Sequence, residues 1–159
     1  MRWLLPALLA AIACGPATNP ADDRIIVPGE RVGAITAATG LAQLRTIYGA
    51  SNVRVTDLDV GEGETERGAV IFPDDPLRRV AVTWADTAAH TPHRIVIRGD
   101  SSAWHTDSGV TLGTPLSRLA QLNGRPFILL GFGWDYAGTV VSWDSGGMDV
   151  PVPGGRLLL

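Results

Sequence analysis

An internal repeat constrains the fold of this chain more than any other feature of its sequence. Residues 39–49 (TGLAQLRTIYG) and residues 114–124 (TPLSRLAQLNG) share the pattern T-x-L-x-x-L-x-x-[IL]-x-G. A second block follows each copy, because glycines at positions 61, 63 and 68 match glycines at positions 131, 133 and 138, with a slightly smaller offset. Two matching blocks in the same order indicate a duplicated unit.

Each first block predicts a short helix. Thr39 and Thr114 are suited to cap the helix by accepting from free backbone N–H groups, and Pro115 fits the first helical turn, where no N–H is needed. The leucines recur at a spacing of three and share one face, and Gly49 and Gly124 suit a left-handed C-terminal cap. Helices this short are marginal alone, so their apolar faces must pack on another element.

The partner of these helices is predicted to be sheet. Segments rich in branched and aromatic residues, several of them alternating with period two, predict strands at 69–72, 79–84, 94–98, 127–130 and 139–143. Residues 73–76 (PDDP) predict a turn, and Pro92 interrupts the chain before the third strand. Because no helix separates each pair of strands, the order favours an α+β fold with an antiparallel sheet and two tandem repeats.

The N-terminus predicts export. Arg2 is followed by an apolar, uncharged run over residues 3–12, and Ala13 precedes Cys14, the single cysteine. A basic start, a short apolar core and a small-residue ending are typical of a secretory signal, here residues 1–13. The apolar run is too short for a membrane span, which needs roughly 20 residues. We therefore expect residues 14–24, which are small, polar and Pro-bearing, to form a flexible tether.

The remaining chain is long enough for one domain. We predict a two-repeat α+β domain over residues 25–145, with repeats at about 32–84 and 107–143, and a C-terminal tail over 146–159. The tail ends in three leucines, Leu157 to Leu159, which would either pair as a final edge strand or mark an interface. A single cysteine allows no internal disulfide, so packing must stabilise the fold. The net charge of −3, with no basic stripe, argues against a nucleic-acid partner.

The most acidic stretch is a candidate metal site. Asp57, Asp59, Glu62 and Glu64 could supply oxygen ligands to calcium, although the spacing is not that of an EF-hand and the second repeat has Phe132 and Trp134 at the positions of the two glutamates. We interpret the stretch as a solvated turn, expect no metal there, and expect no cofactor elsewhere.

Catalytic candidates are sparse. His90, His93 and His105 could join in a zinc site only with converging ligands that the sequence does not supply. Ser101, Ser102 and Ser108 lie near His105 in sequence, but a hydrolytic triad is defined by geometry and no nucleophile elbow is present. We assign no catalytic residue.

Aromatic residues in a glycine-bounded loop offer a candidate recognition surface. Phe132, Trp134, Asp135 and Tyr136 could form a binding hot spot, because aromatic rings bury a large area at low entropic cost. The alternative is that these rings fold back over the sheet. For Trp84, Trp104 and Trp143, which lie in or beside predicted strands, a core position is the better interpretation.

Two resemblances extend these expectations. Residues 11–14 (AIAC) resemble a lipobox, which implies a lipid on Cys14; the alternative is an ordinary signal peptide that leaves a free cysteine. The segments at 28–33 (PGERVG), 61–66 (GEGETE), 122–127 (LNGRPF) and 131–139 (GFGWDYAGT) resemble a family of uncharacterised bacterial exported proteins, which implies no function. The repeat unit is also similar to those of β-lactamase-inhibitor-like proteins and of the small lipoprotein of the outer-membrane barrel-assembly machinery, which place a short helical pair against an antiparallel sheet.

These observations predict a lipid-anchored envelope protein that acts as a non-enzymatic binding or assembly module. Its partners would be the membrane, through the lipid on Cys14, and an envelope protein. Gly15 differs from the aspartate that resembles an inner-membrane retention signal, which implies the outer membrane, facing the periplasm. The alternatives are an exported enzyme whose site is not visible in sequence, and a calcium-binding surface protein.

Overall fold

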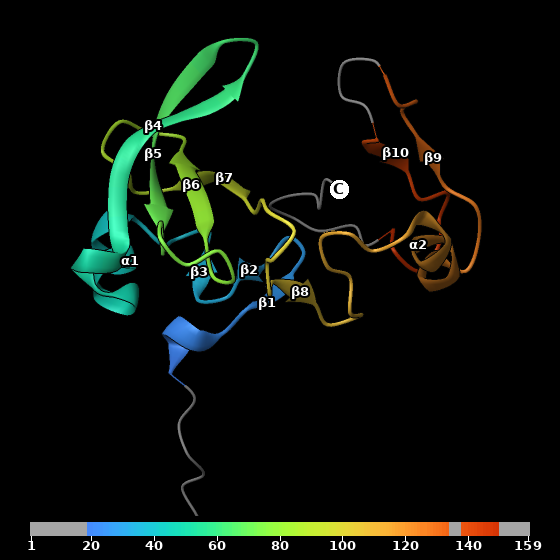
Figure 1. Cartoon of the computed structure of the whole chain (residues 1–159), viewed down its shortest axis with the longest axis horizontal. Coiled ribbons are helices and arrows are strands. Elements are labelled where there is room, and N and C mark those ends of the chain that lie inside the picture. Colours follow the sequence, from blue (N-terminus) through green and yellow to red (C-terminus); the bar gives the residue numbers. More distant parts are fainter. Residues whose placement is uncertain (1–18, 134–137, 150–159) are drawn as a thin grey trace, which may run out of the picture.

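The computed structural model describes residues 19–133 and 138–149 (Figure 1). Helices α1 (Leu41–Tyr48) and α2 (Leu116–Asn123) accompany three β-sheets, so the predicted α+β class is confirmed. Two single-turn 3₁₀ helices, η1 (Pro20–Asp22) and η2 (Ala50–Asn52), flank α1 in sequence. No helix of the described part is long and apolar enough to cross a bilayer.

The largest sheet is an antiparallel meander of four strands. Its order is β4 (Val53–Gly61), β5 (Glu64–Ile71), β6 (Val80–Trp84) and β7 (Pro92–Val96). Strands β5 to β7 confirm the three strands predicted there. Helix α1 lies beside this sheet (Figure 1), and the side chains buried between these elements form the main core. Its largest fully buried side chains are Ile35, Leu44, Ile71, Val80 and Val82.

The interpretation of the acidic stretch as a solvated turn is confirmed only at its centre, and it is wrong for the residues on either side, which belong to strands. Residues 53–71 form a long hairpin, and only Glu62 and Gly63 turn, both with positive φ. Asp57 and Asp59 are exposed in the outer half of β4, and Asp57 faces Arg67 across the hairpin, with Oδ1 3.1 Å from Nη1. Asp57 and Asp59 have the same parity as the core residues Val53 and Val55, but they lie further along the hairpin, which extends past the rest of the sheet (Figure 1). Their carboxylates stay in solvent, so the acidic run did not prevent strand formation.

A second sheet has the order β3-β2-β1-β8 and was not predicted. Strands β1 (Ile25–Val27), β2 (Arg31–Val32) and β3 (Ile35–Thr36) form an antiparallel meander, but β1 pairs in parallel with β8 (His105–Thr106). The expectation of antiparallel sheet alone is therefore wrong here. Strands of two or three residues are too short to show a period-two pattern, so the sequence carried no signal for them.

Strands β9 (Ile128–Leu129) and β10 (Val140–Ser142) form a two-stranded antiparallel sheet beside α2, apart from the meander (Figure 1). Both strands and both helices lie where the sequence predicted them. Of the three leucines of α2, Leu119 is buried, Leu122 is half-buried and Leu116 is 45% exposed. One face of α2 therefore packs, as expected, although less completely than the face of α1.

The predicted helix caps need correction. Thr39 and Thr114 do not cap the helices; the N-cap residues are Gly40 and Pro115, so Pro115 lies just outside the first turn. Gly124 adopts the predicted left-handed conformation, but Gly49 combines a φ of 86° with an extended ψ of 137°. The chain turns differently after α1 because η2 follows at once.

The two threonines instead close turns before the helices. Thr39 Oγ1 accepts from Thr36 N at 2.9 Å, and Thr114 Oγ1 accepts from Thr111 N at 2.8 Å. In each turn the second threonine's N–H donates to the first one's carbonyl oxygen, at 3.0 and 3.1 Å. This local exchange of hydrogen bonds orients the chain as it enters each helix.

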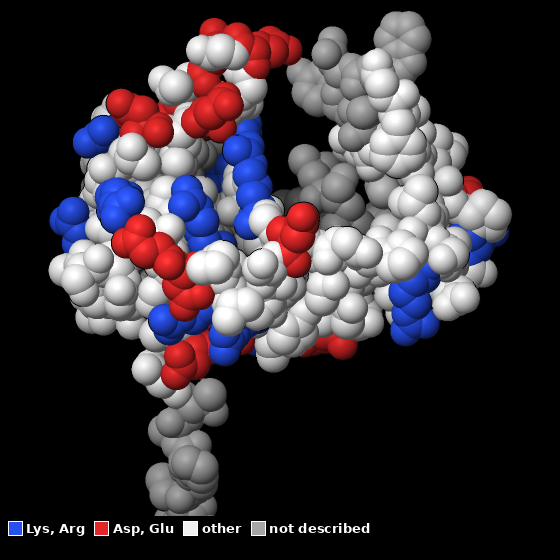
Figure 2. Space-filling view, viewed as in Figure 1, with Lys and Arg blue, Asp and Glu red and all other residues white. Residues whose placement is uncertain are grey.

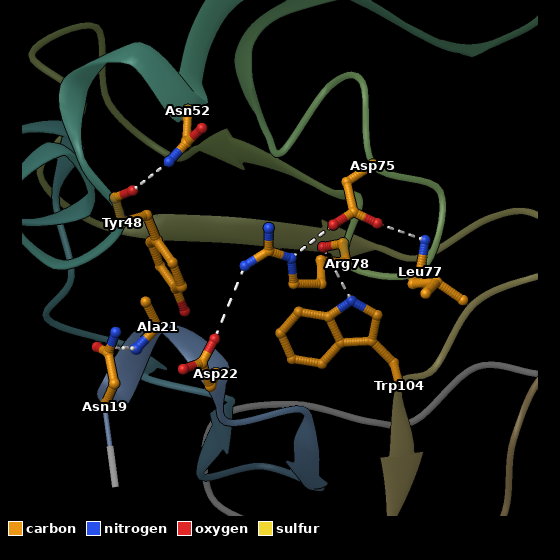
Figure 3. Close-up of polar contacts among 9 residues, drawn as sticks. All are labelled: Asn19, Ala21, Asp22, Tyr48, Asn52, Asp75, Leu77, Arg78 and Trp104. Atoms are coloured by element: carbon orange, nitrogen blue, oxygen red, sulfur yellow. Dashed lines mark hydrogen bonds and ion pairs between the residues drawn. The ribbon is translucent and has the colours of Figure 1, made fainter.

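A polar node joins the N-terminal residues to the meander (Figure 3). Arg78, in the loop between β5 and β6, pairs with Asp75 at 2.6 Å and lies 3.7 Å from Asp22 of η1. Its guanidinium also lies 3.9 Å from the centroid of the Phe72 ring. The indole N–H of the buried Trp104 donates to the Arg78 carbonyl at 3.2 Å. The loop is thereby fixed to segments distant in sequence, and the core position predicted for Trp104 is confirmed.

The ends of the predicted tether and tail belong to the folded body. Asn19 caps η1, and Ala21 packs against the main core. At the other end, Met148 N donates to Asn123 Oδ1 at 3.1 Å, and Gly147 N donates to the Asn123 carbonyl at 2.8 Å. The remainder of both segments, with the signal and Cys14, lies outside the described residues.

Candidate functional site

An apolar cleft lies between strand β7 and the sheet of β1, β2, β3 and β8. Its volume is about 450 Å³, within the range of roughly 300–1,000 Å³ that is common for ligand sites. The walls are mainly branched aliphatic side chains, with one tryptophan at the base. The members used below are Ile26, Val32, Ile35, Ile95, Ile97 and Trp104.

The outer edge of β7 borders this cleft, and the hydrogen-bond pattern fixes which backbone groups point outward. Phe72 N donates to the Asn52 carbonyl, so Phe72 directs its backbone groups to the β4 side of β5. Ile71 and Ala69 have the opposite parity, and they therefore direct their backbone N–H and C=O groups toward β6. The same alternation holds through the register of β6 and β7. The backbone N–H and C=O groups of Arg94 and Val96 therefore point toward β6.

Ile95, between Arg94 and Val96, therefore directs its N–H and C=O away from the sheet. No strand pairs with this edge in the part of the chain that the structure describes. Ile95 and Ile97 also line the cleft. Unpaired strand groups beside an apolar cavity form a template on which a further strand can add.

Charged side chains rim the cleft unevenly. Arg31 is held in place, because its Nη1 lies 2.5 Å from Asp23 Oδ2 and 3.0 Å from the Gly33 carbonyl. Arg94 is exposed and takes part in none of the ion pairs found among the described residues, so its guanidinium is free to bind a carboxylate. Glu30 and His93 complete the rim.

The acidic residues proposed as metal ligands do not converge. Asp57 is engaged by Arg67, and Asp59 Oδ1 accepts from Gly61 N at 2.9 Å. Glu62 and Glu64 are exposed at the hairpin tip. Within residues 19–133 and 138–149, no three side chains of the His, Cys, Asp or Glu type are grouped to hold a metal.

The histidines and serines are likewise dispersed. His90 lies 3.6 Å from Asp86, His93 lines the cleft, and His105 Nδ1 lies 3.1 Å from the Ala103 carbonyl. Ser108 Oγ lies 2.8 Å from Thr106 Oγ1 and bonds to no histidine in the described part of the chain. The structure thus brings together neither a zinc site nor a triad from these candidates.

Of the aromatic candidates, the described part contains only Phe132, which is 69% exposed. Trp134, Asp135 and Tyr136 lie outside the described residues. Trp84 and Trp143 are half-buried, and Trp143 packs on Phe127 with ring centroids 5.0 Å apart. Phe132 is compatible with a recognition surface, which remains a prediction.

Exposed apolar residues gather around α2 and the β9–β10 hairpin. Figure 2 shows charged side chains concentrated over the half that holds α1 and the meander, whereas the other half is mostly uncharged. Large apolar side chains exposed on and beside these elements are Leu112, Leu116, Ile128, Leu130, Phe132 and Val141. This surface is the second candidate for an interaction.

The cleft was missed at the sequence level because its walls come from four separate segments. Only β7 was predicted, and the sequence does not say which strand lies at a sheet edge. A usable signal was the Ile-x-Ile spacing of Ile95 and Ile97, which places two apolar side chains on one face.

Comparisons with protein-family models, characterised proteins and solved structures give no match to this chain. The family resemblance drawn from the sequence therefore stays a prediction, and the function must be argued from the site itself.

Proposed function

We propose that this chain is a lipid-anchored envelope protein whose folded body binds an extended segment of a protein partner along strand β7. The observation that carries the proposal is the outer edge of β7 at Ile95, which pairs with no strand among the described residues and borders an apolar cleft of about 450 Å³. Backbone hydrogen bonds at such an edge give affinity, and pockets for alternate side chains give specificity.

The chemistry of the cleft defines the segment that would bind. An added strand directs every second side chain to the same face, so apolar residues at alternate positions would contact Ile26, Val32 and Ile97. Arg94 at the rim favours a carboxylate near one end of the segment, because a guanidinium binds a carboxylate with two parallel hydrogen bonds.

The scaffold in this proposal is a tandem repeat of one unit: a threonine turn, a helix and a hairpin. Support comes from the equal hydrogen bonding of the Thr36–Thr39 and Thr111–Thr114 pairs and from helices that begin at matching positions of the repeat, Leu41 and Leu116. Each helix is followed by an antiparallel pair, β4–β5 or β9–β10. The second unit lacks a described counterpart of β6 and β7.

The anchor in this proposal is a lipid on Cys14, with the body held outside the cytoplasm. The signal-like residues 1–13 and the lipobox resemblance support it. The intact mass of the protein from a bacterial host tests it: we expect a diacylglyceryl-sized increment that disappears in Cys14→Ser. A mature chain that begins at Cys14 without this increment would contradict the anchor.

The cleft is tested by photo-cross-linking from position 95 in the bacterial envelope, with the exposed Thr46 of α1 as the control position. A partner captured only from position 95 is purified and titrated calorimetrically against the Cys14→Ser chain. We expect Ile95→Pro to lower affinity at least tenfold, because proline lacks the outward N–H, whereas Ile95→Val keeps it and binds normally. Capture from both positions, or equal affinity of the two variants, would refute binding along β7.

A further inference from the structure

Asn123, the last residue of α2, fastens the helix to the chain that follows β10. Its exposed fraction is 2%, and its Nδ2 donates to the carbonyls of Arg125 and Trp143, both at 2.9 Å. Its Oδ1 accepts from Met148 N at 3.1 Å. One buried side-chain amide therefore ties α2 to residues 143–149.

The same amide stands next to a backbone nitrogen that can attack it. Of the asparagines in the chain, Asn19 precedes proline and Asn52 precedes valine, whereas Asn123 precedes Gly124. Asparagine is thermolabile because the backbone nitrogen of the next residue can attack its Cγ, and a glycine there has no side chain to hinder the approach. Gly124 is placed there by the fold, since it closes α2 in the left-handed conformation with a φ of 73°. The helix cap thus creates a reactive Asn-Gly pair.

We propose that Asn123 is a deamidation site whose rate is set by the detachment of residues 143–149 from α2. In the folded chain both reacting groups are engaged. The Gly124 N–H donates to the carbonyls of Ala120 and Gln121, at 3.0 and 3.2 Å, and the side-chain amide is held by its three hydrogen bonds. Attack needs the amide to turn onto the Gly124 nitrogen, which these bonds oppose. The closed form is therefore protected, and a local opening makes the pair reactive.

The reaction has two steps and consumes only water. Hydroxide from the solvent takes the proton of the Gly124 nitrogen, this nitrogen bonds to Cγ of Asn123, and the Cγ–Nδ2 bond breaks. The Nδ2 group takes a proton from water and leaves as ammonia. Water then opens the five-membered succinimide at one of its two carbonyl carbons, which gives aspartate or isoaspartate at position 123.

The product cannot restore the lost hydrogen bonds. An ionised carboxylate only accepts, so the oxygen that replaces Nδ2 would face the carbonyl oxygens of Arg125 and Trp143, which lose their donor. Buried acceptors without a partner are destabilising. Deamidation therefore converts a reversible opening of residues 143–149 into a permanent one. The first repeat has Tyr48 at the matching position, which carries no amide, so this change is confined to the second unit.

The experiment follows the mass gain of peptides that contain Asn123, in the full chain carrying Cys14→Ser, together with hydrogen–deuterium exchange of residues 143–149. Gly146→Ala opens the segment without changing the Asn-Gly pair, because a Cβ at Gly146 would overlap the Asn123 side chain. Gly33→Ala is the matched control, because its Cβ would crowd the Asp23 carbonyl and Trp104 instead. Asn123→Asp represents the product.

We expect Gly146→Ala to speed both deamidation and exchange at residues 143–149 by about tenfold or more, and Gly33→Ala to leave both rates unchanged. Asn123→Asp should exchange these amides as fast as Gly146→Ala does. Equal deamidation rates in the wild type and Gly146→Ala would overturn the proposal, and so would wild-type exchange in Asn123→Asp. Circular dichroism confirms that each variant is folded, and none of these outcomes depends on partner binding at β7.

Discussion

The helix–hairpin of residues 36–71 and that of residues 111–142 start with the same threonine turn and differ in what covers them. In the first, β6 and β7 extend the hairpin into a four-stranded sheet, and Leu44 of α1 is completely buried. In the second, the described hairpin has two strands, and six large apolar side chains on and beside α2 and the hairpin are exposed. The comparison shows that the local sequence pattern is enough to form a helix followed by a hairpin. The strands that pair with the hairpin decide how completely its apolar side chains are buried.

Corresponding positions in the two helices show this difference directly. Tyr48 and Asn123 are the last residues of α1 and α2, at matching positions of the shared sequence pattern, and both are buried. Tyr48 packs edge-on against Phe72, and its hydroxyl has no hydrogen-bond partner among the described residues. Asn123 instead bonds three backbone groups through its side chain. Apolar packing therefore fixes the end of α1. The end of α2 is fixed by the three hydrogen bonds of the Asn123 side chain, which we call the polar clasp.

The largest expected effect tests the packing difference. Leu44→Ala should lower the free energy of unfolding by about 4 kcal/mol, because its site is enclosed on all sides. Leu119→Ala, at the matching position of α2, should cost only about 2 kcal/mol, because the partly exposed Leu116 and Leu122 of the same helix can relax around the cavity. Urea denaturation measures both values. Equal losses would show that the two units are packed alike.

A backbone substitution sharpens the comparison next. At Gly33, with φ of 56°, an added Cβ would lie 2.6 Å from the Asp23 carbonyl and 3.0 Å from Trp104. We expect Gly33→Ala to cost about 3 kcal/mol, from overpacking together with left-handed strain. Gly124 has a φ of 73° but open space around it, so Gly124→Ala should cost about 1 kcal/mol. Thermal denaturation of both variants measures these losses of stability. A larger loss in Gly124→Ala than in Gly33→Ala would refute the tight packing around Gly33.

The polar clasp gives a third prediction. Asn123→Ala removes bonds to the Arg125 and Trp143 carbonyls, both 2.9 Å long, and to the Met148 N–H. We expect a loss of about 2 kcal/mol, because partly buried backbone groups lose their partners. Exchange at residues 143–149 should rise more than exchange in β4–β7. Uniform exchange across the chain would mean that the two units unfold together.

The smallest effect is expected at Tyr48. Tyr48→Phe should change stability by less than about 1 kcal/mol at pH 7, because it removes a hydroxyl without a hydrogen bond. Burial raises the pKa of Tyr48 to about 12. The unfolded chain loses this proton near pH 10 and the folded chain near 12, so stability falls as pH rises between them. Urea midpoints from pH 9 to 12 should fall more steeply in the wild type than in Tyr48→Phe.

The candidate site was less predictable than the elements that build it. Strand β7 could be foreseen from its branched residues, but its position at the edge could not, since edge or centre depends on which strands pair. The acidic run over residues 57–66 was assigned as a whole to a turn because composition outweighed alternation, although Asp57 and Asp59 alternate with Leu58 and Val60, a period-two pattern that predicts a strand. Thr39 and Thr114 were expected to cap helices, and a threonine three positions earlier in each case offered the competing turn.

The sequence by itself determined the two helices, the strands from β5 to β7 and the β9–β10 hairpin, because periodicity and turn residues act between neighbours in the chain. Only the tertiary structure decided the parallel pairing of β1 with β8, since it joins Ile25 to His105 across most of the domain. That pairing places β1 to β3 beside β7 and forms the cleft. Its strands are stabilised by distant contacts rather than by local propensity, and a local pattern cannot encode them.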